Sequence, residues 1–334
     1  MDDSTLLSVE GLKVFFPLKQ SLMDRLAGHK RQHVRAVDGV SFDVKRGKTL
    51  AVVGESGCGK TTLGRSIVRL ASPAAGTMKF RGAEISGPKA WQDGTLRKDI
   101  QYIFQNPYAS LNPKATVLDA VRRPLDIFGL YHESERNRRA LQLLAMTGIA
   151  ASQATRYPHE FSGGQRQRIS IARALAVEPS LIIADEPTSA LDVSIQCQIL
   201  DLLADLQRQL GLSMIFISHD LGVVNFISDE VIIMYLGQVV ERGRTRSIFR
   251  TPAHPYSRAL IDALPRRGSS RHEARVKLKG YIPSPINPPG GCLLHPRCPF
   301  AQERCRHEVP PMKPVGQDQS AACHFAGQLD LQSP

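Results

Sequence analysis

The sequence predicts an α/β fold with a mostly parallel sheet at its core, an antiparallel β part, a helical part and a small C-terminal extension. Three features of the chain support this prediction. Short apolar runs, TLAVVG, LIIADEP and MIFISHD, alternate with segments of helical periodicity, which is typical of parallel sheets. The last two runs end in acidic or polar residues. Beyond Pro252 the chain becomes rich in proline, so we expect a domain boundary there.

The remaining strands follow from local patterns. Residues 6–16 and 34–44 partly alternate apolar and polar side chains, which favours strands, with Gly39 in a turn. Residues 76–82 and 100–104 are further expected strands. Together with the three apolar runs, these segments supply the strands of the predicted sheets.

Helical spacing of apolar residues gives the helices and the domains. It is expected at 62–70, over much of 107–157 and most strongly at 193–210. We expect a main domain at 1–253, with a helical subdomain at about 106–160, and an extension at 254–334.

Composition restricts the class of protein. The 334 residues carry a formal net charge of +12, which suggests an anionic partner. Without an RNA-binding signature or zinc-finger spacing, nucleic acid is not the expected partner, whereas the basic segment Lys19–Arg35 could face anionic lipid. The chain lacks a secretory signal and any run of about eighteen apolar residues, so we expect a cytosolic protein.

The strongest local signal is GESGCGKTT, which lies between an expected strand and an expected helix. It fits the P-loop pattern, in which backbone N–H groups and a helix N-terminus bind phosphate. Lys60 would reach the β- and γ-phosphates, and the Thr61 hydroxyl would bind magnesium. Cys58 is most simply a small filler residue. The residues assigned to this nucleotide site are Gly54, Ser56, Gly57, Cys58, Gly59, Lys60, Thr61 and Thr62.

Two further strand ends carry chemistry. Ligands bind at the carboxyl ends of strands in open α/β sheets, and Asp185, Glu186 and His219 stand at such ends. Asp185 would hold magnesium, and Glu186 would act as the general base on an attacking water. His219 could contact the γ-phosphate. The catalytic residues we expect are Glu186, His219 and Lys60.

A Gly-Gly turn opens a helix in EFSGGQRQRISIARAL. Ser162 lies near the N-cap, and Gly163 and Gly164 expose backbone N–H groups, which makes a second anion-binding end. Two such ends suggest that each nucleotide lies between two chains.

At this point the chain resembles the ATP-binding subunits of ABC transporters, over about residues 5–255. The P-loop, FQNPY, FSGGQRQR, ADEPTSALD and SHD occur in that order and at the family's spacings. The resemblance implies an ATPase with a P-loop NTPase fold, working as a head-to-tail dimer with ATP and Mg. Ser162, Gly163, Gly164 and Gln165 would then close on the partner's nucleotide.

The resemblance also implies roles for three other residues. Gln105 would sense the γ-phosphate, contribute to the Mg site and signal to the helical subdomain, which docks on the permease. Asp192 would communicate between the two ATP sites. Adenine would stack on an aromatic side chain of the first strand, and comparison with the subfamily favours Phe16 over Phe15.

The end of the chain resembles the C-terminal extension of oligopeptide and dipeptide importers. The matching segments are HPYSRALIDALP, IPSPINPPGGC and HPRCPFAQERC. This resemblance implies a second ATPase subunit (paralogue or self), two permease subunits and an external substrate-binding protein, at the cytoplasmic face of the inner membrane. Related systems carry nickel, glutathione or sugars, so those substrates stay open.

Cys292, Cys298, Cys305 and Cys323 are separated by five, six and seventeen residues. Four thiolates suit zinc or an iron–sulfur cluster, but zinc sites favour cysteine pairs about two to four residues apart. Some members of the resembled family hold a four-iron four-sulfur cluster on this pattern. We therefore expect a cluster, with zinc or no metal as alternatives, that staples a proline-rich extension. His295, His307 and His324 are possible substitute ligands.

Other classes of ABC protein fit less well. A soluble ATPase acting on ribosomes or DNA usually carries two cassettes or a long coiled coil, and this chain has neither. An exporter subunit is disfavoured by the importer-type extension. A binding module without hydrolysis is disfavoured by Glu186, His219 and Ser162.

Overall fold

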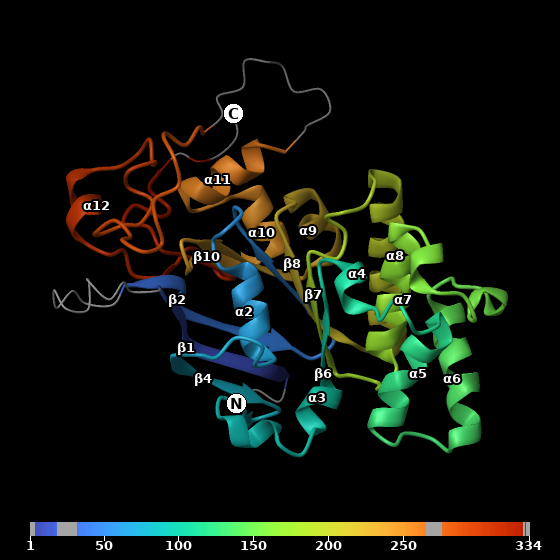
Figure 1. Ribbon diagram of the computed structural model, residues 1–334. Coiled ribbons are helices and arrows are strands. Elements are labelled where there is room, and N and C mark those ends of the chain that lie inside the picture. Colours follow the sequence, from blue (N-terminus) through green and yellow to red (C-terminus); the bar gives the residue numbers. More distant parts are fainter. Residues whose placement is uncertain (1–3, 19–31, 265–275, 330, 332–334) are drawn as a thin grey trace. The chain divides into compact units, whose positions relative to one another are not determined.

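The computed structural model describes residues 4–18, 32–264, 276–329 and 331 (Figure 1). The chain divides into two compact units, each described separately. Unit 1 comprises Met1–Leu6, Val44–Thr49 and Gly87–Ile217, and unit 2 comprises Leu7–Asp43, Leu50–Ser86 and Ser218–Pro334. No helix within the described ranges has the length and apolar character needed to cross a membrane.

Unit 1 contains a parallel set of strands: β6 (Ile100–Ile103), β7 (Leu181–Asp185) and β8 (Ser213–Ser218). Every residue of β7 and β8 is buried, as their continuous apolar sequence predicts. Ile103 pairs with Ala184, and Asp185 pairs with Ile217. The carboxyl ends of the three strands are therefore aligned along one edge.

The helices of unit 1 are α3 (Thr95–Asp99), α4 (Pro107–Ser110), α5 (Val117–Ile127), α6 (Glu133–Met146), α7 (Gly163–Leu175) and α8 (Val193–Leu210), with 3₁₀ turns at Pro88–Trp91, Ala151–Gln153 and Pro158–Glu160. Helices α4, α5, α6 and α8 lie where the apolar spacing predicts them, α7 follows the predicted Gly-Gly turn, and α3 was not predicted. Helices α5, α6 and α7 pack on one another (Figure 1). Thr116 caps α5, and Gly211 ends α8 in the left-handed conformation with φ 64°.

Unit 2 contains an antiparallel sheet and a mixed set of strands. The first has the order β2-β1-β4-β5, formed by β1 (Thr5–Pro17), β2 (His33–Lys45), β4 (Ala75–Phe80) and β5 (Ala83–Glu84). In the second, β3 (Thr49–Val53) runs parallel to β9 (Glu230–Tyr235), which pairs antiparallel with β10 (Gln238–Arg244). The C-terminal strands β11 (Lys313–Pro314) and β12 (Gln319–Ala321) continue from β10.

The helices of unit 2 are short. They are α2 (Lys60–Ile67), α9 (Leu221–Ile227), α10 (Thr245–Arg250), α11 (Pro255–Asp262) and α12 (Glu303–His307). The extension after residue 253 is thus joined to the sheet, because β12 pairs with β10. The boundary expected at 253 lies inside unit 2 and stays a prediction.

Two local expectations differ from the structure, and one apolar strand was not predicted. Gly39 lies within β2 with φ +80°, and not in a turn, so the strand continues through an irregular position that glycine permits. The helix expected at 62–70 begins at Lys60 and ends at Ile67. The apolar run that forms β9 was not assigned from the sequence. Most of the basic segment, residues 19–31, lies outside the described residues.

Candidate functional site

The glycine-rich loop of unit 2 connects β3 to α2, and two of its glycines are required by packing. A Cβ on Gly54 would lie 2.3 Å from the Met234 carbonyl oxygen, and a Cβ on Gly59 would lie 2.0 Å from the Ala36 carbonyl oxygen. Gly57 has φ +80° with open space around it. The loop therefore follows a path close to other backbone segments that residues with side chains could not follow.

Lys60 and the first turn of α2 provide the positive end of the loop. Lys60 is 5% exposed, and its Nζ donates to the carbonyl oxygens of Gly54 at 2.7 Å and Glu55 at 3.1 Å. Gly59 is the N-cap of α2, and no side chain caps this helix. Thr61 and Thr62 are half-buried in its first turn. This arrangement suits an anion with several oxygen atoms.

The other loop residues differ in exposure. Ser56 and Gly57 are exposed, whereas Cys58 is buried. Burial raises the pKa of the Cys58 thiol, which is therefore kept neutral and unreactive, as its filler role predicts.

Glu55, the second residue of the loop, is held by groups from much later in the chain. Its N–H donates to the Tyr256 hydroxyl at 2.8 Å. Its carboxylate accepts two hydrogen bonds from Arg297, at 2.7 and 3.0 Å. Sequence reasoning missed both partners.

In unit 1, Asp185 and Glu186 stand at the carboxyl end of β7. Asp185 is 1% exposed, and its Oδ2 accepts a hydrogen bond of 2.8 Å from the Tyr102 hydroxyl on β6. A carboxylate so deeply buried needs compensating partners, and a divalent cation would supply the largest one. Tyr102 orients this carboxylate and was not predicted; its signal was a polar hydroxyl inside a buried strand.

Glu186 adopts a conformation that is uncommon for a residue with a side chain. Its φ is +45°, and its backbone N–H donates to the Ile217 carbonyl oxygen at 2.9 Å. Gln105 Nε2 donates to Glu186 Oε2 at 3.0 Å and lies 3.4 Å from Ser189 Oγ. Positions of this kind cluster at functional sites. The structure thus brings Gln105 and Glu186 together.

The helix α7 begins at the Gly-Gly turn. Ser162 is its N-cap: Ser162 Oγ accepts from the Gln165 N–H at 3.3 Å, and Gln165 Oε1 accepts from the Ser162 N–H at 3.0 Å. A Cβ on Gly164 would lie 2.4 Å from Ile195 Cγ2, so α7 approaches α8 closely there, and Gly163 has Leu191 nearby. The sequence prediction of a capped helix start is confirmed.

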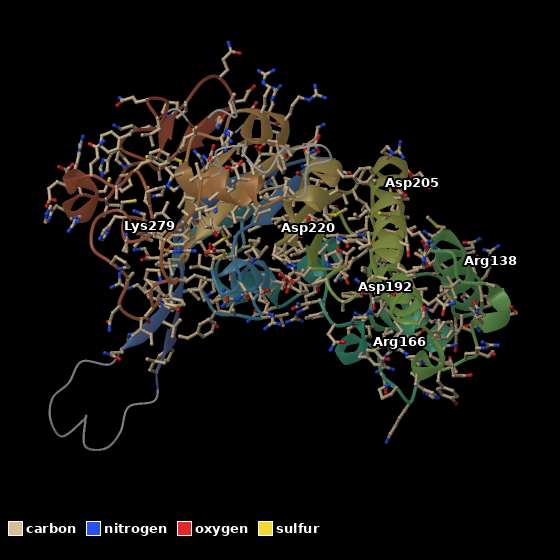
Figure 2. The ribbon with its side chains drawn as sticks, turned by 90° about the horizontal axis from the view of Figure 1, so that it is seen from above. Arg138, Arg166, Asp192, Asp205, Asp220 and Lys279 are labelled. Atoms are coloured by element: carbon tan, nitrogen blue, oxygen red, sulfur yellow. The ribbon has the colours of Figure 1, made fainter. Side chains whose placement is uncertain are left out.

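One further contact and one exposed carboxylate lie in this region. The Arg166 guanidinium lies 3.7 Å from the centroid of the Tyr108 ring, which joins α7 to the segment after Gln105. Asp192 is the exposed N-cap residue of α8, and Figure 2 labels it with Asp205, which lies further along the same helix.

The remaining expected residues lie in unit 2. His219 is exposed directly after β8, and Asp220 next to it caps α9 (Figure 2). Phe16 is 44% exposed near the end of β1, and Phe15 is half-buried. The greater exposure of Phe16 leaves its ring accessible to a planar ligand.

The four C-terminal cysteines lie in residues 276–329 of unit 2, which we call the cysteine lobe. Cys305 and Cys323 are buried, and Cys292 and Cys298 are half-buried. The pKa of Cys292 is raised to about 11, mainly by burial and in smaller part by Cys305 and Cys323. The pKa of Cys298 is raised to about 12, again mainly by burial and in smaller part by the other three cysteines. The thiols are therefore near enough to influence one another.

A single metal ion does not fit this lobe as it stands. Throughout the described part of the chain, no group of three or more His, Cys, Asp or Glu side chains is arranged to hold one. Of the possible substitutes, His324 Nε2 is 2.9 Å from the Glu308 carbonyl oxygen, His307 pairs with Glu303, and His295 Nδ1 is 3.0 Å from the Cys292 carbonyl oxygen. The metal-stapled extension expected from the sequence is not established.

Comparison with known proteins places these features in a family. Residues 37–189 match the ABC transporter family model, and residues 240–305 match the C-terminal region of oligopeptide/dipeptide transporters. The oligopeptide transport ATP-binding protein AppF of Bacillus subtilis (strain 168) is 47% identical over 328 residues, covering 97% of this chain and 98% of AppF.

Two further matches agree. The dipeptide transport ATP-binding protein DppF of Haemophilus influenzae is 47% identical over 322 residues, covering 96% of this chain and 97% of DppF. Among solved structures, the dimeric post-hydrolysis state of the ATP-binding cassette MJ0796, bound to ADP and Pi, has a TM-score of 0.62 and 30% identity, covering 72% of this chain and 99% of that one. The P-loop fold and the nucleotide, ATP with Mg, follow from this similarity.

The chain therefore belongs to the ATP-binding proteins of the ABC transporter family, in the group that carries the oligopeptide/dipeptide C-terminal region, and is an ATPase.

Proposed function

We propose that this ATPase drives the import of di- or oligopeptides through a membrane permease. The observation that carries the catalytic part is the hydrogen bond of 3.0 Å between Gln105 and Glu186, next to the buried Asp185. The peptide substrate is supported by similarity to AppF and DppF over nearly the full chain. Nickel, glutathione and sugar are less favoured substrates.

In this proposal each side chain has one task. Lys60 and the loop N–H groups bind the β- and γ-phosphates, and Thr61, Gln105 and Asp185 hold Mg, which neutralises phosphate charge. Glu186 accepts the proton of the attacking water, and His219 contacts the γ-phosphate. Ser162, Gly163, Gly164 and Gln165 close on a nucleotide bound by a second ATPase chain, and Asp192 relays between the two sites.

The assembly we propose has a second ATPase subunit, two permease subunits and an external substrate-binding protein, with this chain peripheral on the cytoplasmic face of the membrane. Closing of the ATPase dimer around ATP would switch the permease between its inward- and outward-facing states. Hydrolysis would reopen the dimer.

Replacing the proposed base tests the catalytic assignment. Glu186→Gln keeps the size of the side chain and its capacity for hydrogen bonds but removes the proton acceptor. We therefore expect turnover to fall by about a hundredfold or more, with ATP binding retained. Glu135→Gln, on the exposed first turn of α6, is the matched control and should behave as wild type. Wild-type turnover in Glu186→Gln would remove the assigned base.

The transport assignment needs its own experiment. Tagged Glu186→Gln, isolated in ATP from gently solubilised membranes, should carry a permease pair and a second ATPase chain, identified by mass spectrometry. Vesicles containing the purified assembly and its binding protein should then take up a labelled dipeptide when ATP is supplied. Recovery of ribosomal proteins with no membrane partner would contradict the importer role.

The cysteine lobe is the second subject of this proposal. We propose that Cys292, Cys298, Cys305 and Cys323 hold a four-iron four-sulfur cluster, with zinc as the alternative. The mutual influence of the thiols and the hydrogen bond of 2.8 Å from the Cys292 N–H to the Cys305 carbonyl oxygen support it. A cluster spans more space between its thiolates than one tetrahedral ion, so it does not need the close grouping that zinc needs.

Metal analysis decides this point. Anaerobically purified protein should contain about four iron and four sulfide per chain. Cys298→Ser should lose both, whereas Cys197→Ser, at an exposed thiol in unit 1, should keep them. Stoichiometric zinc without iron would favour the alternative, and neither metal would exclude both.

A further inference from the structure

Arg297, in the cysteine lobe, forms a two-point ion pair with the phosphate-binding loop. Its Nη1 and Nη2 donate to Glu55 Oε2 and Oε1 at 2.7 and 3.0 Å, across 242 positions of sequence. The Arg297 side chain is 9% exposed and the Glu55 side chain 26% exposed. A bidentate pair shielded from water in this way fixes both groups in position as well as in charge.

The lobe side of this pair is itself fixed. The Arg297 N–H donates to the Leu294 carbonyl oxygen at 2.8 Å, and the Arg297 carbonyl oxygen accepts from the Lys279 N–H at 2.9 Å. Figure 2 labels Lys279 in this lobe. The guanidinium also lies 5.7 Å from the centroid of the Tyr235 ring. Arg297 is therefore a rigid extension of the lobe.

On the loop side, every polar part of Glu55 has a partner. Tyr256 accepts from its N–H at 2.8 Å, Arg297 holds its carboxylate, and its carbonyl oxygen accepts from Lys60 Nζ at 3.1 Å. Tyr256 and Arg297 both come from the region after residue 253. The loop residue next to Gly54 is thus positioned by the extension.

Charge makes the pair matter for nucleotide binding. A carboxylate close to a triphosphate repels it, and the repulsion is stronger where water is partly excluded. Arg297 neutralises Glu55, and Glu55 in turn raises the pKa of Arg297 above its ordinary value. Without Arg297, the loop would keep an unpaired negative charge near the anion it must bind.

We propose that Arg297 is a positioning residue of the ATP site, which neutralises and orients Glu55. The state of the cysteine lobe then sets the affinity of the P-loop for ATP. The proposal rests on the ATP-binding activity of the chain and holds whether or not the cysteines bind a metal.

The first test compares two arginines of the same lobe. Arg297 directly precedes Cys298 and Arg304 directly precedes Cys305, and both pair with a glutamate. The pair of Arg304 with Glu308 is exposed and involves no residue of the loop. We expect Arg297→Gln to raise the Kd of a fluorescent ATP analogue with Mg, and the KM for ATP, by about tenfold, with a smaller change in kcat. Arg304→Gln should match wild type.

The second test separates neutralisation from a general loss of structure. Adding Glu55→Gln to Arg297→Gln removes the unpaired carboxylate, so the double variant should bind ATP more tightly than Arg297→Gln alone. Arg297→Lys keeps the charge without the two-point geometry and should have an intermediate Kd. Higher salt should narrow the difference between Arg297→Gln and wild type, because it screens the repulsion.

The outcomes are distinct. Equal Kd values for Arg297→Gln and Arg304→Gln would overturn the proposal. A double variant that binds ATP no better than Arg297→Gln would overturn the electrostatic argument. If Arg297→Gln unfolds, as shown by its thermal midpoint, Arg297→Lys and the double variant decide, since both remove the two-point geometry without leaving a buried unpaired charge.

Discussion

The two glycine-rich helix starts of this protein are built in opposite ways. Helix α2 begins after Gly59, which has φ 106°, and no side chain caps it. Helix α7 begins after Ser162, and a reciprocal pair of hydrogen bonds with Gln165 caps it. The first start is suited to bind an anion with its own backbone N–H groups, whereas the second has already satisfied some of its donors.

This difference indicates that the two helix starts have different roles in nucleotide binding. Helix α2 carries its own cation at its first residue, Lys60, which is 5% exposed. In the first turn of α7 the cation is Arg166, whose guanidinium lies over the Tyr108 ring and donates to the Pro158 carbonyl oxygen. The exposed Ser162 stands on a closed cap. We therefore expect the α2 start to determine ATP affinity, and the α7 start to act on a nucleotide bound elsewhere.

The largest effect should come from Lys60. Lys60→Ala removes the only cation of the first turn of α2, so the Kd for ATP should rise by about a hundredfold. Arg65→Ala, in the last turn of the same helix and exposed, is the control and should leave the Kd near wild type. A Lys60→Ala protein that binds ATP normally would break the comparison, because the two helix starts would then not differ in affinity.

A smaller effect is expected at Ser162. Ser162→Ala should leave the ATP affinity of the isolated chain unchanged, destabilise α7 by about 1 kcal/mol and lower turnover. Ser162→Asn restores a good N-cap and should recover the thermal midpoint but not the turnover, since the hydroxyl is still absent. Recovery of turnover together with the midpoint would mean that Ser162 acts only as a cap.

The sequence predicts the local features of these sites well. The helix expected at 193–210 has those bounds as α8, and Ser162 is the N-cap residue expected of FSGGQ. Local periodicity and capping chemistry determine such features, so a short window contains the information. The strand β9 was missed although its run VIIMY is apolar, because no chemical motif follows it.

Long-range positioning was not predictable. The Arg297–Glu55 pair joins residues 242 positions apart, and neither residue type stands out in its own segment. The neighbouring cysteines favoured a metal-centred interpretation of HPRC, whereas the arginine beside them makes the contact that the structure describes. The hydrogen bond from the Tyr102 hydroxyl to Asp185 depends in the same way on long-range strand pairing, which places Tyr102 opposite Ile183.

A third helix start sharpens the comparison, because its cap can be titrated. His254 is 2% exposed, and its Nδ1 accepts from the Tyr256 N–H at 3.1 Å at the start of α11. Burial lowers the pKa of His254 from 6.5 to about 3, against a smaller opposing effect of a hydrogen bond with the Ala322 backbone. Protonation would also remove the cap, because a protonated ring has no acceptor.

The last expected effect concerns stability alone and is a loss of stability in mild acid. Between pH 6.5 and about 3, His254 binds a proton in the unfolded chain but not in the folded protein. The contribution of His254 to folding stability is therefore complete above pH 6.5 and is lost as the pH falls. At pH 5 we expect a loss of about 2 kcal/mol, seen as a lower thermal midpoint. His254→Asn keeps a cap without the titration, so its midpoint should fall less steeply. Burial raises the pKa of Glu241, so Glu241 opposes this loss of stability in acid, and it does so equally in wild type and in His254→Asn. Parallel midpoint curves for wild type and His254→Asn would show that this closed helix start is not the titrating group.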